Sequence, residues 1–246
     1  MKKYFSLHYP NGNFELFSLS HILTLVFIVL FNIAIIIWLK KTKNQKVLHY
    51  FEYGWAALLI GQELASYIWL KSVDAWSIQT SLPLHLCGVG LILAAIMLIN
   101  KNYFLFEITY FWGFAGSIQA LLTPDLTPYP FPHFVYIQFF VCHAAIITAV
   151  LYMVFIKKYR PTLKSILKVA IVTNLYMIFI AGFNLITNAN YLYICHKPQG
   201  ASLLDFFGPW PWYILGIEIF GFISCLIYYL PFAVINYRKK EQAVKE

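Results

Sequence analysis

The sequence is poor in charged residues. Asp, Glu, Lys and Arg make up only 11% of its 246 residues, and just 10 residues are acidic. A soluble domain of this length needs a far more polar surface. Hydrophobic residues reach 61% of the chain, and the mean hydropathy is +0.68. Because one spanning helix takes about 20 apolar residues, seven such helices use most of the chain and leave no room for a soluble domain.

Cysteine is also scarce, with four residues and no CxxC pair. We place Cys87, Cys142 and Cys225 inside spanning helices and Cys195 in a loop, which excludes a disulfide framework and a zinc-type ligand spacing. H-x-x-x-H and H-E-x-x-H motifs are missing as well. The N-terminal segment is polar as far as His21, which argues against a cleavable signal peptide. We therefore expect no metal and no cofactor.

Seven apolar stretches are present, and we predict that each one is a transmembrane helix. Their expected ranges are residues 20–39, 48–70, 82–99, 103–122, 134–156, 166–186 and 212–235. Ser81 would cap the third helix, and Pro83 would occupy its first turn. The expected fold class is all-α, a polytopic membrane protein whose residues 1–246 form a single domain.

Positive charge is distributed unevenly among the loops. One alternate set of loops holds 14 of the 18 Lys and Arg residues, namely Lys40, Lys41, Lys43, Lys46, Lys101, Lys157, Lys158, Arg160, Lys164, Lys168, Arg238, Lys239, Lys240 and Lys245. The other set holds only Lys2, Lys3, Lys71 and Lys197. Basic loops stay in the cytoplasm. We therefore expect the N-terminus outside and the C-terminus inside, in a multi-pass protein of the cell membrane.

The net charge of +8 comes mainly from residues that flank helix ends on one side of the membrane. Such residues favour contact with anionic lipid headgroups rather than with nucleic acid. We therefore expect membrane lipids as partners and no nucleic acid. No feature of the sequence specifies an oligomeric state.

Polar side chains gather at a similar depth, near the outer ends of six predicted helices. They are Glu63, His85, Cys87, Gln119, Thr123, Gln138, Cys142, His143, Asn184, Asn188 and Glu218. Polar groups are costly in hydrocarbon and usually face a bundle interior or a cavity. We predict that these side chains line one polar cavity that opens outward, while residues 91–99 and 146–156 form nearly apolar inner halves of their helices.

The interpretation of single residues stays open at several points. His85 and Cys87 are two residues apart, so they point to nearly opposite sides of a regular helix, and only one of them would face the cavity. Each candidate also has a structural alternative. Cysteines often act as small apolar fillers, and buried polar residues can simply hydrogen-bond between helices. The Pro- and aromatic-rich loops at 123–133 and 188–210 could form a lid or an ordinary aromatic belt.

Four segments carry a resemblance to a known family: Leu82–Cys87, Gly116–Asp125, Phe139–His143 and Gly200–Tyr213. Together they resemble the YwaF-like bacterial integral membrane family, over nearly the whole chain. That family is similar to the eukaryotic transmembrane protein 164 family, which is associated with acyl transfer among phospholipids. It is more distantly similar to the androgen-induced-gene hydrolases of fatty acid esters.

The resemblance implies an acyltransferase or lipid ester hydrolase acting at the outer leaflet. By this resemblance Cys87 matches the cysteine of the eukaryotic acyltransferase and His143 matches the histidine of the ester hydrolases, and no threonine nucleophile is assigned. Acyl transfer also needs a group that orients the base and donors for the oxyanion. We expect the remaining catalytic and substrate-binding roles to fall to His85, Glu63, Asp205, Gln119, Gln138, Asn184, Asn188 and Glu218.

Other function classes compete with this one. A small-molecule or ion-coupled transporter, or a ligand-binding membrane module, would use Glu63 and Glu218 as cation sites, and Glu52 and Asn174 keep this alternative open because they lie deeper. A metal-dependent hydrolase could use His85, His143, Glu63 and Cys87 as ligands. A structural partner of cell-envelope enzymes is the remaining alternative.

Overall fold

The structure is a computed structural model that describes residues 2–10, 12–198 and 202–245, with the side chains of all of these except 2, 239–241 and 243–245. The described residues are helical or irregular and include no β-strand, so the predicted all-α class is confirmed. Internal contacts divide the chain into two compact units, Met1–Tyr159 and Arg160–Glu246.

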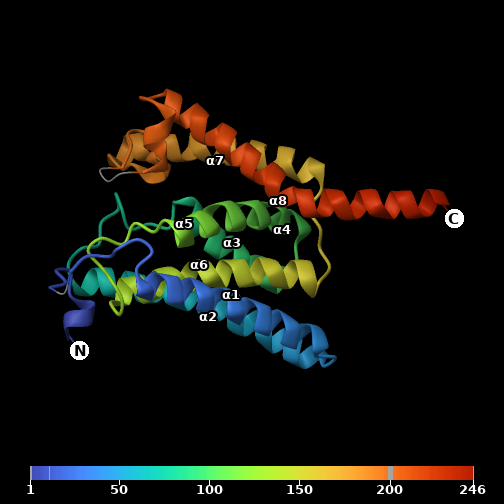
Figure 1. The fold of residues 1–246 in the computed structure, drawn as a ribbon. Coiled ribbons are helices and arrows are strands. Elements are labelled where there is room, and N and C mark those ends of the chain that lie inside the picture. Colours follow the sequence, from blue (N-terminus) through green and yellow to red (C-terminus); the bar gives the residue numbers. More distant parts are fainter. Residues whose placement is uncertain (1, 11, 199–201, 246) are drawn as a thin grey trace. The chain divides into compact units, whose positions relative to one another are not determined.

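Unit 1 consists of five helical rods (Figure 1). They are α1 (Leu19–Lys41), α2 (Gln45–Ser72), α3 (Leu86–Asn100), a rod built from α4 (Tyr103–Trp112), η2 (Gly113–Ile118) and α5 (Gln119–Leu122), and α6 (Phe134–Phe155). A short helix, η1 (Lys2–Phe5), precedes them. The helix α6 contacts each of the other four rods, and 50% of its apolar window is buried, against 22% for α1. The centre of unit 1 is therefore α6.

Unit 2 consists of α7 (Leu163–Thr187), η3 (Tyr191–Tyr193), η4 (Leu203–Phe207) and α8 (Trp212–Lys245). Thr162 and Ser165 form a capping box that begins α7. The short helix η4 packs on α8 at Gly216, where an added Cβ would lie 2.6 Å from Phe207. The connection between the two long helices therefore packs on its own unit.

Four helices are long and apolar enough to cross a membrane: α1, α6, α7 and the segment Trp212–Arg238 of α8. The helix α3 is apolar but shorter. The rod from α4 to α5 covers the predicted range of 103–122, and Asn102 caps it by accepting a bond from the Leu105 N–H. Most other helices extend a few residues beyond their predicted limits, because polar and basic residues continue the helix past the apolar stretch.

The predicted start of the third helix was wrong. The helix α3 begins at Leu86 with His85 at its N-cap, so neither Ser81 nor Pro83 belongs to it. The N–H of Leu84 donates to the carbonyl of Leu82, which closes a tight turn around Pro83. The backbone of Pro83 then packs on Gly88, where an added Cβ would lie only 2.7 Å from the Pro83 Cα.

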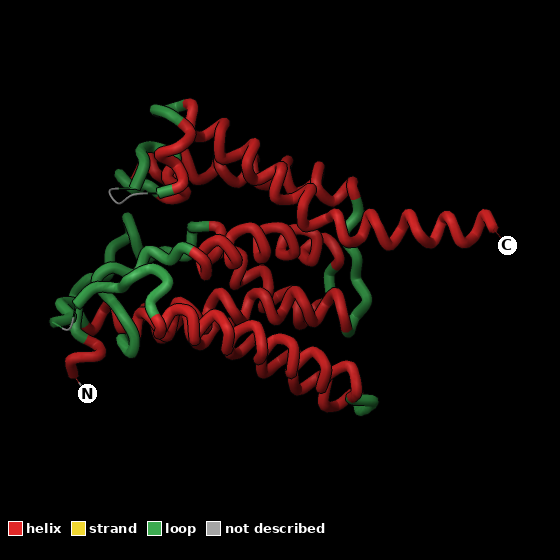
Figure 2. The backbone as a smooth tube through the Cα atoms, viewed as in Figure 1, coloured by secondary structure: helices red, strands yellow, loops and turns green. Residues whose placement is uncertain are grey.

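The longer loops of unit 1 gather at one end of its helices, which we call the loop end (green in Figure 2). Residues 5–7, the N-terminal strap, are held there by three side chains that bond their carbonyls. Trp69 Nε1 donates to Phe5 at 2.8 Å, Tyr129 Oη donates to Leu7 at 3.0 Å, and His133 Nε2 bonds to Ser6 at 3.0 Å. The opposite end carries Lys40, Lys101 and Lys157 and is the basic end.

Candidate functional site

The rod from α4 to α5 changes its helical geometry where it passes its neighbours. Residues Gly113–Ile118 form a π-helix, a form that is rare and is frequently found at functional sites. An added Cβ at Gly113 would lie 3.1 Å from Ile146 on α6, and one at Gly116 would lie 3.3 Å from Cys87 Sγ on α3. The two glycines thus bring the π-helix into close contact with both α6 and the predicted nucleophile.

A polar cluster forms at the same level. Gln138 donates to Gln62 Oε1 at 2.6 Å, and Gln62 is also hydrogen-bonded to the thiol of Cys142. Cys142 in turn lies within electrostatic range of Cys87 and Glu63. The structure therefore brings together predicted residues from α2, α3 and α6. Gln62, which links them, was assigned no role in the sequence analysis although it precedes Glu63.

The bond made by His143 determines which ring nitrogen carries the proton. Nδ1 lies 2.7 Å from the carbonyl oxygen of Phe139. Because a carbonyl only accepts, Nδ1 carries the hydrogen, and Nε2 holds the lone pair of the neutral ring. Within the described part of the chain, Nε2 has no hydrogen-bond partner. A buried imidazole with a free Nε2 is suited to take a proton from a nearby acid.

Two other buried histidines of unit 1 differ from His143, because both of their nitrogens are engaged. His21 accepts from the Phe17 N–H and bonds the Leu121 carbonyl, and His133 accepts from the Val135 N–H and bonds the Ser6 carbonyl. These bonds connect loops and helix ends. Both histidines therefore act in packing, and burial lowers the pKa of His133 so that the neutral ring is favoured.

The other predicted residues of unit 1 lie around this cluster. The Glu63 carboxylate is partly exposed and makes no hydrogen bond or ion pair with any described residue. Gln119 follows the π-helix and donates to Thr123 Oγ1 at 2.8 Å. His85, as the N-cap of α3, lies outside the helix that carries Cys87, so the two side chains are not constrained to opposite faces of one helix. It is Cys87 that contacts the π-helix.

The predicted residues of unit 2 take part in local contacts. The Asn184 amide bonds the backbone of Tyr191 in both directions, at 2.9 and 3.0 Å. Asn188 is the exposed C-cap of α7, and Glu218 is partly exposed on α8. Asp205 accepts from the Ser202 N–H at 2.8 Å and pairs with Lys197 at 3.5 Å, and these two contacts hold its pKa below the usual range.

One buried residue with unused bonding capacity was missed by the sequence analysis. Ser117, in the π-helix, is 1% exposed, and its Oγ has no hydrogen-bond partner among the described residues. Ser117 lies inside the segment that carries the family resemblance, yet a lone serine between a glycine and an isoleucine gives no sequence signal. Only the packing of the rod reveals it.

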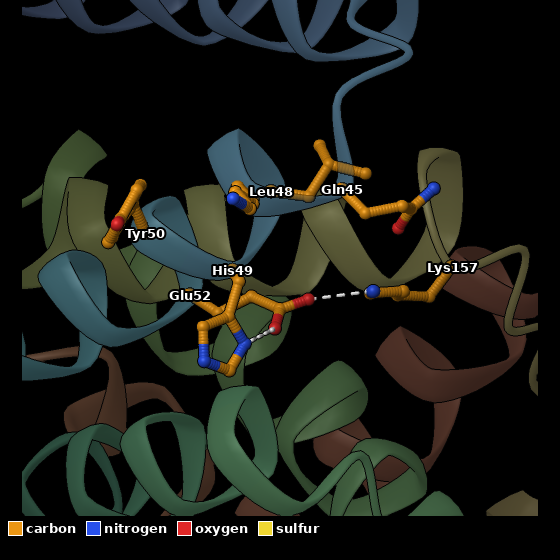
Figure 3. Close-up of a pocket in the computed structure, with 7 residues that line it drawn as sticks. Gln45, Leu48, His49, Tyr50, Glu52 and Lys157 are labelled. Atoms are coloured by element: carbon orange, nitrogen blue, oxygen red, sulfur yellow. Dashed lines mark ion pairs between the residues drawn. The ribbon is translucent and has the colours of Figure 1, made fainter.

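A second polar cluster lies at the basic end, around Glu52. Its carboxylate, 4% exposed, pairs with Lys101 and Lys157 at 2.7 Å each and accepts from Tyr152 Oη at 2.5 Å. His49 Nδ1 is 3.9 Å away (Figure 3). These side chains tie together α2, the turn after α3 and the end of α6. The carboxylate is thus fully engaged, beside an open groove lined in part by Gln45, Lys46, Leu48 and Tyr50.

The described residues contain no group of three or more His, Cys, Asp or Glu side chains that could hold a metal ion. Residues 16–229 match the TMEM164 family. The chain belongs to the TMEM164 family. No curated protein and no solved structure matches it.

Membership of the TMEM164 family confirms the predicted resemblance and makes the chain a membrane protein with several apolar helices. The matched range contains all the predicted site residues of both units. Of the four segments that carried the resemblance, three are fully described. The fourth begins at Gly200 and Ala201, which lie outside the described residues.

Proposed function

We propose that this TMEM164-family protein transfers or hydrolyses acyl chains of phospholipids, with Cys87 as nucleophile and His143 as base. The observation that carries the proposal is the contact of Cys87 with the π-helix, beside a polar cluster that ends at Cys142, the residue before His143. A thiol nucleophile needs a base that removes its proton. The free Nε2 of His143 has the chemistry for this step.

The proposed reaction has two stages. The Cys87 thiol gives its proton to His143 Nε2 while sulfur bonds the ester carbonyl carbon. The bond from that carbon to the glycerol oxygen then breaks, and the oxygen takes the proton back from His143 as a lysophospholipid leaves. In the second stage a lysophospholipid hydroxyl, or water, attacks the thioester carbonyl carbon while His143 Nε2 takes its proton. The carbon–sulfur bond then breaks, and the Cys87 sulfur takes the proton back from His143. The first acceptor gives acyl transfer, and water gives hydrolysis.

We further propose seven membrane crossings with the loop end outside, in the cell membrane, so that the reaction takes place at the outer leaflet. The four helices that are long and apolar enough to span, together with the basic residues at the opposite end, support this orientation. The loops at residues 123–133 and 188–210 would then lie at the outer headgroup layer.

The engagement of Glu52 favours the enzyme over a transporter. Glu52 was a deep polar residue that kept a transport path open, and its carboxylate is held by two lysines and a tyrosine. Asn174, the other such residue, donates to the Ala170 carbonyl of its own helix. The Glu52 carboxylate is therefore not free to coordinate a transported cation.

The test is acyl transfer by the purified protein in liposomes that contain phosphatidylcholine with a labelled acyl chain and an unlabelled lysophospholipid. We expect label in newly formed diacyl lipid, or in free fatty acid if water is the acceptor. The Cys87→Ala and His143→Ala variants should lose this product. Full activity of either variant, once shown to be folded, would remove that residue from the mechanism.

A further inference from the structure

The hydroxyl of Ser117 is a buried polar group without a partner. Buried donors are nearly always paired, and one that stays unpaired calls for a bound ligand, a water or a functional role. The residue sits in the π-helix, whose irregular geometry sets its side chain apart from the regular helix on either side. Two independent features, the missing partner and the π-helix, thus coincide at one residue.

The packing of the rod tells which way Ser117 faces. Gly113 packs on Ile146 and Val150 of α6. Ser117 lies four residues further, about one turn, and so returns to nearly the same face of the rod. The rod and α6 run in opposite directions, since Tyr159, just after α6, bonds the Lys101 carbonyl just before α4. Ser117 therefore faces α6 about one turn before Ile146.

The turn of α6 at that position holds Cys142 and His143, which precede Ile146 by four and three residues. The residue before Ser117 is Gly116, which packs against Cys87 Sγ on α3. The Ser117 hydroxyl is thus flanked by the turn of His143 and by the residue that touches the predicted nucleophile. A hydroxyl in this place would meet the carbonyl group that Cys87 attacks.

We propose that the Ser117 hydroxyl donates a hydrogen bond to the ester carbonyl oxygen of a bound phospholipid. The carbonyl oxygen accepts and cannot donate, which matches an unpaired donor. During attack by sulfur this oxygen gains negative charge, and a pre-positioned donor in a site that excludes water stabilises it. The inference deepens the proposed function and rests on it for its kinetic part. Ser117 would then be a catalytic residue.

The same rod offers a matched control. Thr109 precedes Gly113 by four residues, so it lies on the same face but toward the basic end. It is fully buried, and its Oγ1 also has no partner among the described residues. The opposing part of α6 there, near Val150, is apolar. Replacing Thr109 by valine removes an unpartnered hydroxyl of the same kind, away from Cys87 and His143.

The first experiment measures lipid retention by native mass spectrometry. Purified protein is mixed with equal amounts of diacyl phosphatidylcholine and of its dialkyl ether analogue, which lacks the ester carbonyls. We expect the wild type to retain the diacyl lipid about threefold to tenfold better, the range of one hydrogen bond. Ser117→Ala should abolish this preference, and Thr109→Val should keep it. The absence of a preference in the wild type, or its persistence in Ser117→Ala, would overturn the proposal.

The second experiment measures acyl transfer and stability of the same variants. Ser117→Ala should lower kcat about 100-fold and raise KM by about the same threefold to tenfold factor as the loss of lipid retention, and Ser117→Thr should restore part of kcat. Its thermal stability should not fall, because the lost hydroxyl has no partner in the protein. Thr109→Val should keep wild-type kcat. A fall in stability that accounts for the loss of activity would instead assign Ser117 a structural role.

The two measurements separate the two proposals. An ester preference that depends on Ser117, in a protein without acyl transfer, supports the carbonyl site and rejects the proposed reaction. Acyl transfer that survives Ser117→Ala unchanged supports the reaction and rejects the role of Ser117.

Discussion

The two ends of unit 1 use buried polar groups in opposite ways. At the basic end, both carboxylate oxygens of Glu52 are engaged, by Lys101, Lys157 and Tyr152. Toward the loop end, two buried polar atoms beside the polar cluster, His143 Nε2 and Ser117 Oγ, make no hydrogen bond to a described residue. A cluster whose polar groups are all hydrogen-bonded or ion-paired holds helices together. Buried donors and acceptors without a partner lower the free energy of unfolding, and a bound substrate that pairs with them can offset this loss. The engaged Glu52 cluster is therefore structural, and the unpaired groups beside Cys87 are those to which we assign the proposed reaction. An unpaired hydroxyl alone does not mark a site, since Thr109 Oγ1 also has no partner among the described residues.

The largest effect is expected on acyl transfer when the proposed nucleophile is removed. We expect Cys87→Ala to lower acyl transfer by on the order of 10³-fold or more, because the variant lacks the thiol that forms the thioester in the proposed reaction. Cys225→Ala, at a free cysteine of unit 2, should keep full activity. Liposome assays with labelled phosphatidylcholine measure both, and equal losses in the two variants would point to general thiol damage instead.

The next largest effect is expected at the basic end. Glu52→Gln leaves Lys101 and Lys157 without a counter-charge. We expect the free energy of unfolding to fall by about 2 kcal/mol, which is less than for a fully buried pair because both lysines are partly exposed. Thermal unfolding in detergent should show a lower Tm. Glu63→Gln, which breaks no ion pair among described residues, should leave Tm nearly unchanged. A larger fall in Tm for Glu63→Gln than for Glu52→Gln would contradict the structural role of the Glu52 cluster.

A smaller effect tests the contact of the π-helix with the thiol. Gly116→Ala places a methyl group 3.3 Å from Cys87 Sγ, so the thiol must shift. We expect about a tenfold fall in kcat, since displacement of a reacting group is costly. Stability should hold, because alanine favours the helix by about 1 kcal/mol over glycine. Gly54→Ala, where the added methyl meets open space, serves as control. Its kcat should match the wild type.

The smallest effect concerns His133 at the loop end, whose two ring nitrogens are both hydrogen-bonded. Burial lowers the pKa of His133 in the folded state, so the open state binds a proton first as pH falls below about 6.5. The stability that His133 gives to the N-terminal strap is thus present above that pH and lost below it. We expect hydrogen exchange of residues 5–7, corrected for its intrinsic pH dependence, to rise a few-fold between pH 7 and 5. His133→Asn should remove this rise.

The apolar pattern was sufficient to predict the helices but not how their polar residues pair. The rod at 103–122 was placed correctly, because Asn102 begins it and Thr123-Pro124 end it. The start of α3 was missed because its apolar run continues through Pro83, and only the packing on Gly88 shows that this segment is a turn. No propensity separates the π-helix from an α-helix, so the position of Ser117 had no signal in the sequence.

The candidate site was predictable in its residue types and only partly in its partners. The depth of Glu63, Cys87 and Cys142 along their helices predicts that they lie near one another, and Cys142 is close enough to the other two for electrostatic interaction. Gln62 was overlooked because a glutamine beside a glutamate draws less attention than the charge. The bond from His143 to its own helix depends on a side-chain rotamer, which spacing does not determine.

The N-terminal strap bears on how the protein is made. The carbonyl of Ser6 is bonded by a side chain 127 residues later, and that of Leu7 by one 122 residues later. A ribosome delivers those partners only after α1 to α5 have emerged. Phe5 can meet Trp69 as soon as α2 has been made, but Ser6 and Leu7 gain these partners only when the residues just before α6 have emerged, so the loop end is completed late in biogenesis.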